Sequence, residues 1–120
     1  MSLRCLIVDD NSFFGDEARS LLEHEGISVV GVAASGDEAV RLAEAFAPDL
    51  ALVDISLGEE SGFDVARRLV DDLNARAPAV IFVSTHDERE FSRRIAASPA
   101  LGFIPKTRLS AERIRQLLGD

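Results

Sequence analysis

Five polar residues that follow short apolar runs of the sequence have side chains able to bind a metal or take part in a reaction. They are Asp9, Asp10, Asp54, Ser84 and Lys106. Three carboxylates gathered in one pocket would repel one another and raise at least one pKa unless a positive charge lay among them. A divalent cation such as Mg²⁺ binds carboxylate oxygens and keeps positions open for water and phosphate. The ammonium of Lys106 would supply a second positive charge.

A metal, an ammonium and a hydroxyl are the groups that hold a phosphoryl group while charge spreads over its equatorial oxygens. A carboxylate can itself be the nucleophile and form an aspartyl-phosphate. Each residue taken alone is more commonly structural, because an Asp after a strand often caps a helix or closes an Asx-turn. The functional hypothesis therefore depends on all five residues meeting in the folded chain.

The elements that must bring them together follow from the hydrophobic pattern. Short runs rich in Val, Ile and Leu predict five strands, over residues 3–8, 27–33, 50–53, 79–83 and 100–104. Apolar residues at helical spacing predict a helix after each strand, four of them over residues 13–25, 63–75, 87–97 and 111–118. The helix after the second strand is opened by residues 35–37 and is broken by residues 48–49. Residues 56–62 are predicted to be a loop.

The predicted strands are continuous apolar runs rather than alternating ones, which is typical of strands buried on both faces. We therefore expect an α/β fold with a parallel five-stranded sheet between two helix layers. Right-handed crossovers favour the flavodoxin-like (βα)5 order 2-1-3-4-5. In that order, ligands bind at the carboxyl ends of the strands, beside strands one and three, and all five polar residues lie at that edge.

Length and composition narrow the class of protein. A chain of 120 residues, 47% hydrophobic, predicts a single domain over residues 1–120 with no effector domain. One cysteine excludes a disulfide framework and a Cys-rich zinc site. No apolar run approaches the roughly 20 residues of a membrane span, and no signal peptide precedes the first strand. We expect a cytoplasmic protein with no membrane partner.

Charge argues against nucleic acid as a direct partner. The formal net charge is −8, whereas a protein that binds the phosphate backbone needs a basic surface. Of the 13 basic residues, Lys106 is the only lysine. Genomic base bias explains an arginine-rich composition. A functional reason for a lysine at position 106 is that its ammonium is a compact point charge, whereas the guanidinium of arginine is a larger planar group.

Short motifs in a fixed order then make the chain similar to a known family. An acidic pair follows Leu6-Ile7-Val8, Asp54 lies within Leu52-Val53-Asp54-Ile55-Ser56-Leu57, and Ser61-Gly62-Phe63 opens a helix. Val83-Ser84 and Gly102-Phe103-Ile104-Pro105-Lys106 complete the set. From Leu3 to Leu118 the chain resembles the receiver domains of two-component response regulators. Each motif alone is weak, but the set in this order is specific.

The resemblance implies a phosphorylation-dependent signalling switch. Asp54 would accept a phosphoryl group from a phosphohistidine on a sensor histidine kinase. Asp10 and Asp54 would bind Mg²⁺ through their carboxylates, Asp9 mostly through water, and Ser56 through its backbone carbonyl. Self-phosphotransfer and slow autodephosphorylation are then the only expected reactions, so the chain is not expected to be an enzyme.

The resemblance also implies how the switch is transmitted. Lys106 and Ser84 would contact phosphoryl oxygens, and the rotamer of Phe103 would follow Ser84. The output surface would comprise helix 87–97, strand 100–104 and helix 111–118, and a homodimer could form through it. Residues 33–39, 48–50 and 105–110 most resemble receivers attached to LuxR-type helix-turn-helix domains, so control of transcription through a separate DNA-binding domain is the expected output.

Three departures from the family pattern carry their own predictions. Thr107 follows Lys106 where proline and a cis bond are frequent, and we expect a trans bond because a non-proline cis bond costs about 3 kcal/mol. Gly58, where proline is frequent, predicts a mobile loop. Pro99 predicts that the fourth helix ends at or before Ser98.

Other functions stay open at this point. A stand-alone or phosphorylation-independent pseudo-receiver would act through protein contacts alone. An aspartyl-nucleophile phosphohydrolase is less consistent with the sequence, because Ser56 stands where many such enzymes have a second Asp. A flavodoxin-like nucleotide site has no support, because Asp-Asp-Asn rather than a Gly-rich loop follows the first strand.

Overall fold

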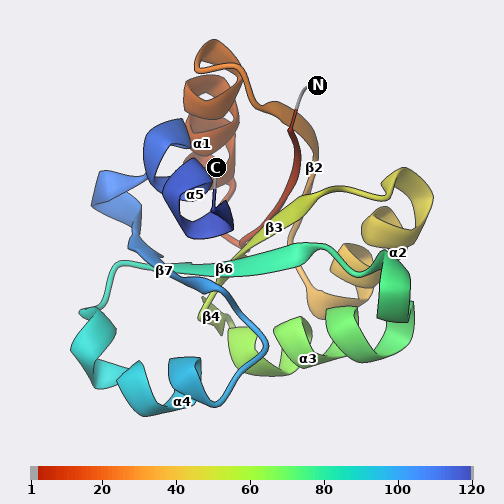
Figure 1. Cartoon of the computed structure of the whole chain (residues 1–120), viewed down its shortest axis with the longest axis vertical. Helices are drawn as coiled ribbons and strands as arrows, with labels where there is room; N and C mark the ends of the chain where they lie inside the picture. The colour runs from red at the N-terminus through yellow and green to blue at the C-terminus, as the bar shows by residue number, and fades with distance from the viewer. Residues whose placement is uncertain (1–2, 120) are drawn as a thin grey trace.

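A parallel sheet lies between two layers of helices in the computed structural model, which describes residues 3–119 (Figure 1). The outermost residues of the expected 1–120 domain fall outside that range. The strands of the sheet are β1 (Arg4–Val8), β2 (Ser28–Ala33), β3 (Leu50–Asp54), β6 (Ala79–Ser84) and β7 (Gly102–Pro105). Their order is β2-β1-β3-β6-β7, which confirms the predicted 2-1-3-4-5 topology.

The register of the sheet aligns the carboxyl ends of four strands, β1, β3, β6 and β7. Val8 of β1 pairs with Val53 of β3, so the residues that follow, Asp9 and Asp54, are neighbours. Asp54 in turn pairs with Val83 of β6. Ser84 then pairs with Pro105 of β7, the residue before Lys106. The polar residues predicted to do chemistry therefore lie at one edge of the sheet.

Helices cover both faces of the sheet, as Figure 1 shows. α1 (Ser12–His24) and α5 (Ala111–Leu118) lie on one face. α2 (Gly36–Phe46), α3 (Gly62–Leu73) and α4 (Ser92–Ala96) lie on the other. Short 3₁₀ turns span Asn74–Arg76, Glu88–Glu90 and Lys106–Arg108. Among residues 3–119, no helix has the length and apolar character needed to cross a membrane.

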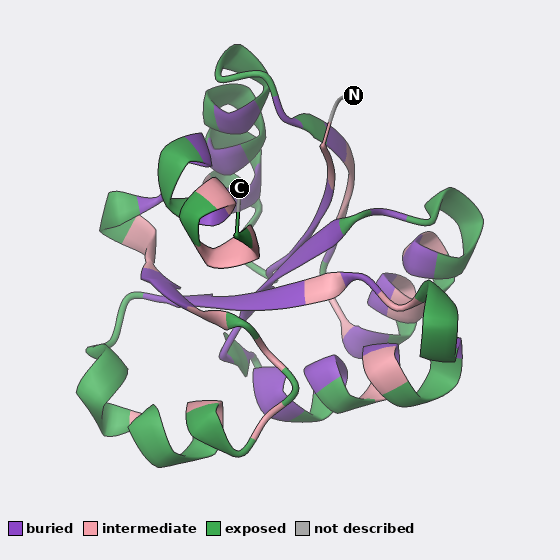
Figure 2. Ribbon diagram, viewed as in Figure 1, coloured by how far each residue is buried: buried purple, intermediate pink, exposed green. Residues whose placement is uncertain are grey.

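The core consists of two apolar layers separated by the sheet. All five residues of β3 are buried, and so are most residues of β1 and β6 (Figure 2). Leu22 of α1 and Ile114 of α5 pack into one layer. Val65 and Leu69 of α3 pack into the other. Burial of the strands on both faces explains why their sequences are continuous apolar runs rather than alternating ones.

The turn after β1 sets where α1 begins. Asn11 caps the helix, because its Oδ1 accepts hydrogen bonds from the backbone N–H groups of Phe13 and Phe14 at 3.1 and 3.2 Å. The N–H of Asn11 donates to Asp9 Oδ1 at 2.8 Å. The acidic pair and the first turn of α1 are thus held in one compact turn at the edge of the sheet.

The predicted helix over residues 87–97 is wrong in extent. A 3₁₀ turn at Glu88–Glu90 comes first, and α4 itself has only five residues. Asp87 accepts a hydrogen bond from the N–H of Arg89 and pairs with its guanidinium at 2.8 Å, contacts that lower the pKa of Asp87 to about 2. Such a local side-chain turn competes with a continuous helix. α4 ends at Ala96, so the predicted stop before Pro99 is confirmed.

Four smaller boundaries also differ from the prediction. Residues 56–62 are not only a loop, because β4 (Ser56–Leu57) and β5 (Glu60–Ser61) form a short antiparallel hairpin. The third helix ends at Leu73 because Asn74 has a φ of 51°. The last strand covers 102–105 rather than 100–104, and the first helix ends at His24. The bond between Lys106 and Thr107 is trans, as predicted, and the mobility of the Gly58 loop stays a prediction.

The one cysteine provides a probe of this core. Cys5 lies in β1 with no exposed surface, and burial raises the pKa of its thiol to about 12. Because the thiolate is the reactive form, we expect native protein to react with a thiol reagent only when the sheet opens. Labelling should be slow in buffer and should accelerate in parallel with global unfolding as urea is added. Fast labelling in buffer would contradict the buried position of β1.

Candidate functional site

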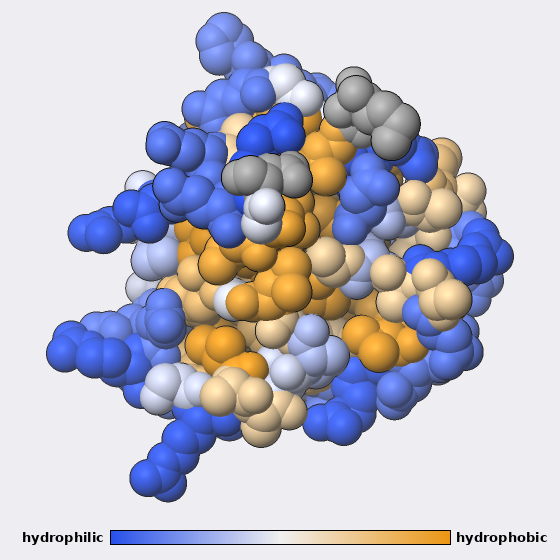
Figure 3. Space-filling model, in the orientation of Figure 1, coloured by the Kyte–Doolittle hydropathy of each residue, from blue (hydrophilic) through white to orange (hydrophobic). Residues whose placement is uncertain are grey.

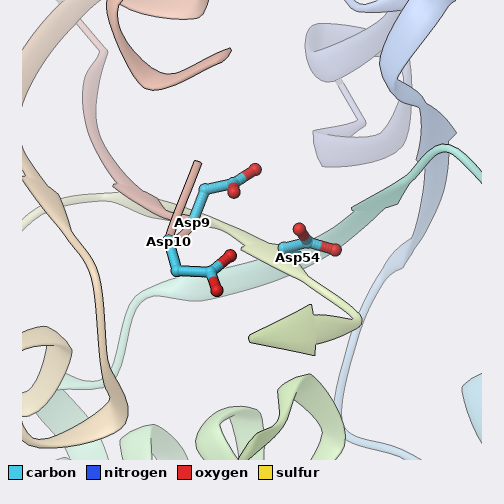
Figure 4. Close-up of side chains that lie close together, drawn as sticks. All are labelled: Asp9, Asp10 and Asp54. Carbon is cyan, nitrogen blue, oxygen red and sulfur yellow. The ribbon is translucent and has the colours of Figure 1, made fainter. Parts of the chain in front are cut away.

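Three carboxylates from the ends of two adjacent strands converge at the edge of the sheet. Asp9 and Asp10 follow β1, and Asp54 is the last residue of β3 (Figure 4). One oxygen from each carboxylate lies within 4.8 Å of the others. Asp9 and Asp54 are 1% and 7% exposed, whereas Asp10 faces solvent. The sequence therefore placed these three residues together correctly.

Lys106 reaches the two buried carboxylates from the end of β7, which is two strands away from β3 in the sheet. Its Nζ lies 2.7 Å from Asp9 Oδ2 and 3.0 Å from Asp54 Oδ2. Only 10% of the lysine side chain is exposed. The first helical turn after β7 positions this side chain, so the ammonium ion is held in place by the sheet order rather than by sequence proximity.

The charges in the pocket act on one another. Burial raises the pKa of Asp54 above its usual range, and the negative charge of Asp9 adds to this, although the N–H of Ser56 and the ammonium of Lys106 partly offset it. Burial lowers the pKa of Lys106, but the carboxylates of Asp9 and Asp54 outweigh that effect and raise it overall. When ionised, three carboxylates and one ammonium leave two negative charges uncompensated.

This arrangement fits a hard divalent cation. All three side chains offer carboxylate oxygens, the ligands that Mg²⁺ and Ca²⁺ prefer. Asp9 Oδ2 is fully buried and receives no hydrogen bond from the described residues beyond its ion pair with Lys106. Asp10 Oδ2 is on the hairpin side of the pocket, where a Cβ added at Gly58 would lie 3.2 Å from it. A metal held by Asp9, Asp10 and Asp54 would supply the missing positive charge.

Ser84 lies at the end of β6 with 1% of its surface exposed. Its Oγ accepts a hydrogen bond from the N–H of His86 at 2.9 Å and lies 3.3 Å from His86 Nδ1. The hydroxyl is thus engaged by the following loop. A contact between Ser84 and a phosphoryl oxygen stays a prediction.

Phe103 lies in the middle of β7, and its side chain is 9% exposed. It belongs to the core layer under α2 and α3, together with Phe82 and Phe63. Its ring is therefore turned inward in this structure, and the expected coupling of its rotamer to Ser84 stays a prediction.

The hairpin after β3 is held against the site by hydrogen bonds of backbone N–H groups. Ser56 donates its N–H to Asp54 Oδ1 at 3.0 Å, and Gly62 donates its N–H to the carbonyl of Ile55 at 2.7 Å. Glu60 Oε1 accepts a hydrogen bond from the N–H of Gly36, at the start of α2, at 2.8 Å. The hairpin thus links the carboxylate of Asp54 to the first turns of α2 and α3.

Gly62 is the position where this packing allows no side chain. A Cβ there would overlap the backbone carbonyl oxygen of Asp54, and backbone cannot move aside as a side chain can. We expect Gly62→Ala to lower the free energy of unfolding by about 3 kcal/mol, at the upper end for overpacking. Urea denaturation measures the loss. Gly31→Ala is the control, because its Cβ would meet only side-chain atoms, the nearest on Leu42 at 3.3 Å. Equal losses for both variants would contradict the prediction.

Sequence reasoning missed two contacts at the site. The ring of Phe14 lies over Lys106, with 4.4 Å between the ring centroid and Nζ. The place of Phe14 in the first helical turn after the acidic pair was the available signal. The hydrogen bond from Gly36 to Glu60 joins distant segments, and no local pattern indicates it.

Comparisons with known proteins agree with this geometry. The sequence model of the response regulator receiver domain matches residues 5–118. The chain is 37% identical over 108 residues to the protein-glutamate methylesterase/protein-glutamine glutaminase of Alkalilimnicola ehrlichii, which covers 88% of this chain and 27% of that protein. It is 28% identical over 103 residues to the transcriptional regulatory protein PdtaR of Mycobacterium tuberculosis, covering 86% and 49%. The chain thus spans about half or less of the length of these curated relatives.

A solved structure supports the same assignment. The two-component response regulator of the LuxR family from an Aurantimonas species superimposes with a TM-score of 0.85 at 26% identity, over 99% of this chain and 87% of that one. The residues matched by the family model, 5–118, include the Asp cluster and nearly all of the five-stranded sheet. This chain belongs to the response regulator receiver domain family.

Proposed function

We propose that this receiver domain is a phosphorylation switch whose phosphoacceptor is Asp54. The observation that carries the proposal is the position of Lys106 Nζ, within 3.0 Å of both Asp9 and Asp54, beside a third carboxylate. A buried carboxylate with an adjacent ammonium and a cluster of oxygen ligands is suited to forming an aspartyl-phosphate.

The reaction is a transfer of a phosphoryl group from a phosphohistidine of a sensor histidine kinase. A carboxylate oxygen of Asp54 forms a bond to phosphorus while the P–N bond of the phosphohistidine breaks, and the departing imidazole takes a proton from solvent. Lys106 releases Asp54 and donates to a phosphoryl oxygen, because the carboxylate loses its charge in the acyl phosphate while the phosphoryl oxygens carry negative charge.

Magnesium is the cofactor in this proposal. Asp10 and Asp54 would hold it through their carboxylates, Asp9 mostly through water, and Ser56 through its backbone carbonyl. When bound, Mg²⁺ would supply positive charge to the phosphoryl oxygens. The proposal is supported by the two uncompensated negative charges of the pocket and by its all-oxygen donor set.

The switch runs from the phosphoryl group to the surface formed by α4, β7 and α5. Ser84 exchanges its contacts with His86 for a phosphoryl oxygen, and Phe103 repacks behind it. The output is a change of partner at that surface, with control of transcription through a separate DNA-binding domain or through a homodimer as the expected readout. Similarity to a LuxR-family response regulator supports this direction.

The test is the intact mass of the protein after incubation with Mg²⁺ and acetyl phosphate. We expect one phosphoryl group on the parent, none on Asp54→Asn, and none when EDTA replaces Mg²⁺. Asp71→Asn, an exposed carboxylate on α3, is the control that should behave like the parent.

Each alternative gives a different result. A folded parent that takes up no phosphoryl group would overturn the proposal in favour of a phosphorylation-independent pseudo-receiver. Rapid consumption of acetyl phosphate without a retained adduct would instead indicate a phosphohydrolase.

A further inference from the structure

We infer that Phe14 is a positioning residue for phosphoryl transfer, because its ring holds the ammonium of Lys106 at the acidic pocket. The inference rests on the proposed function for its kinetic consequence but has a structural consequence of its own. The contact joins the first turn of α1 to the turn after β7, two elements at opposite ends of the chain.

The geometry surrounds the ammonium on two sides. Asp9 Oδ2 and Asp54 Oδ2 lie 2.7 and 3.0 Å from Nζ, and the face of Phe14 lies 4.4 Å from it. The ammonium donates a hydrogen bond to Asp54 Oδ2, forms an ion pair with Asp9 Oδ2, and has the ring of Phe14 on a further side. A cation over the centre of an aromatic face is attracted by the ring quadrupole, most strongly where water is excluded. Lys106 is 10% exposed, which satisfies that condition.

The space beside this contact shows what the ring prevents. Phe14 and Lys106 both line a surface groove of about 640 Å³, whose other walls include Leu21, Thr85 and Thr107. Without the ring, the flexible lysine stem can turn into this groove and leave the carboxylates. The lysine would then have to be ordered during phosphoryl transfer, when its ammonium has to reach a phosphoryl oxygen, and this would raise the activation free energy of that step.

Phe13 provides a matched control. It is the adjacent residue of the same helical turn, it has the same side chain, and 70% of its surface is exposed. The cation–π contact is to Phe14. A loss that depends on the ring over Lys106 should therefore appear in Phe14→Leu and not in Phe13→Leu, whereas damage to the helix turn should appear in both.

The structural test uses the fact that Lys106 is the only lysine in the chain. In protein labelled with ¹³C-lysine, one set of Hε–Cε signals reports this side chain alone. We expect the Hε signals of the parent to be shifted upfield by the ring current of Phe14. The shift should disappear in Phe14→Leu and persist in Phe14→Tyr and in Phe13→Leu. An unshifted parent signal would overturn the inference whether or not the protein is phosphorylated.

The kinetic test measures phosphoryl uptake from acetyl phosphate at saturating Mg²⁺. We expect Phe14→Leu to lower the maximal rate constant by roughly 3- to 30-fold, the range that a partly to fully desolvated cation–π contact corresponds to, with little change in the donor concentration at half-maximal rate. Phe14→Tyr should restore the parent rate. In a Lys106→Met background the further change Phe14→Leu should have no effect.

Two results would overturn the positioning role while leaving the proposed function intact. One is a Phe14→Leu variant that is phosphorylated at the parent rate. The other is an equal loss from Phe14→Leu in the presence and in the absence of Lys106. If the parent itself takes up no phosphoryl group, the proposed function fails, and the lysine signals still decide whether Phe14 holds Lys106.

Discussion

Replacing Lys106 by methionine is expected to lower the free energy of unfolding by about 2–4 kcal/mol in metal-free buffer at neutral pH. Breaking a buried ion pair leaves an uncompensated charge and costs about 3–5 kcal/mol, and the side chains here are nearly but not fully buried. Lys106 is 10% exposed, and the carboxylates of Asp9 and Asp54 that it contacts are 0% and 10% exposed. The variant leaves three carboxylates facing one another with no cation.

Added Mg²⁺ should recover much of that loss. A ligand that binds only the folded state stabilises it by RT ln(1 + [L]/Kd), so a pocket that has lost its ammonium gains more from a divalent cation than the parent does. Urea denaturation, first with EDTA and then with excess Mg²⁺, measures the free energy of unfolding of parent and variant under each condition. The two stabilities should lie closer together in Mg²⁺ than in EDTA.

Arg68→Met is the matched control for this prediction. Arg68 also forms one close ion pair, 2.9 Å from Asp37, but the two side chains are 40% and 88% exposed. Surface pairs contribute about 0–1 kcal/mol, so this variant should lose little and should not respond to Mg²⁺. A Lys106→Met variant as stable as Arg68→Met in EDTA would contradict the prediction.

Asp54→Asn is expected to change stability in the opposite direction: the variant should be more stable than the parent in metal-free buffer at neutral pH. Burial raises the pKa of Asp54 in the folded state above its unfolded value, so the folded state favours the protonated form. The corresponding stability is present at pH values below the unfolded pKa and is lost as the pH rises through the folded pKa. An amide cannot ionise, so the variant avoids that loss.

The difference between parent and Asp54→Asn should therefore shrink as the pH is lowered. Urea denaturation in EDTA between about pH 3 and pH 8 measures it, since that range runs from below the unfolded pKa of an aspartate to above neutrality. Mg²⁺ should stabilise the parent more than the variant, because the variant lacks one ligand. An Asn variant that is less stable than the parent at neutral pH would contradict the sign of the shift.

The sheet and its functional edge could be predicted because both depend on residues that lie close together in sequence. Runs such as Leu50–Asp54 are apolar on both faces and end in a polar residue, which defines a buried strand and its carboxyl end at once. Once the strand order is known, the ends of β1 and β3 must be neighbours. Asp9, Asp10 and Asp54 therefore follow from the pattern and the topology alone.

What the sequence did not predict depends on contacts between distant segments or on competition between local structures. The hairpin of β4 and β5 relies on Glu60 accepting a hydrogen bond from Gly36 of α2. The fourth helix is shortened because Asp87 pairs with Arg89 in a local turn. The sequence pattern does not tell which of these two local structures, the turn or the helix, is the more stable. The contact of Phe14 with Lys106 joins α1 to the turn after β7, two segments far apart in the sequence, so no local pattern indicates it.

The sheet order also has a consequence for the timing of synthesis. Asp9 follows β1, the first strand to leave the ribosome, whereas Lys106 follows β7, the last of the five. Until β7 docks beside β6, a nascent chain holds the carboxylates of Asp9 and Asp54 without their ammonium partner. A chain that stops before β7 therefore cannot place an ammonium beside these two carboxylates, so the charge balance of the pocket is reached only when synthesis has passed Lys106.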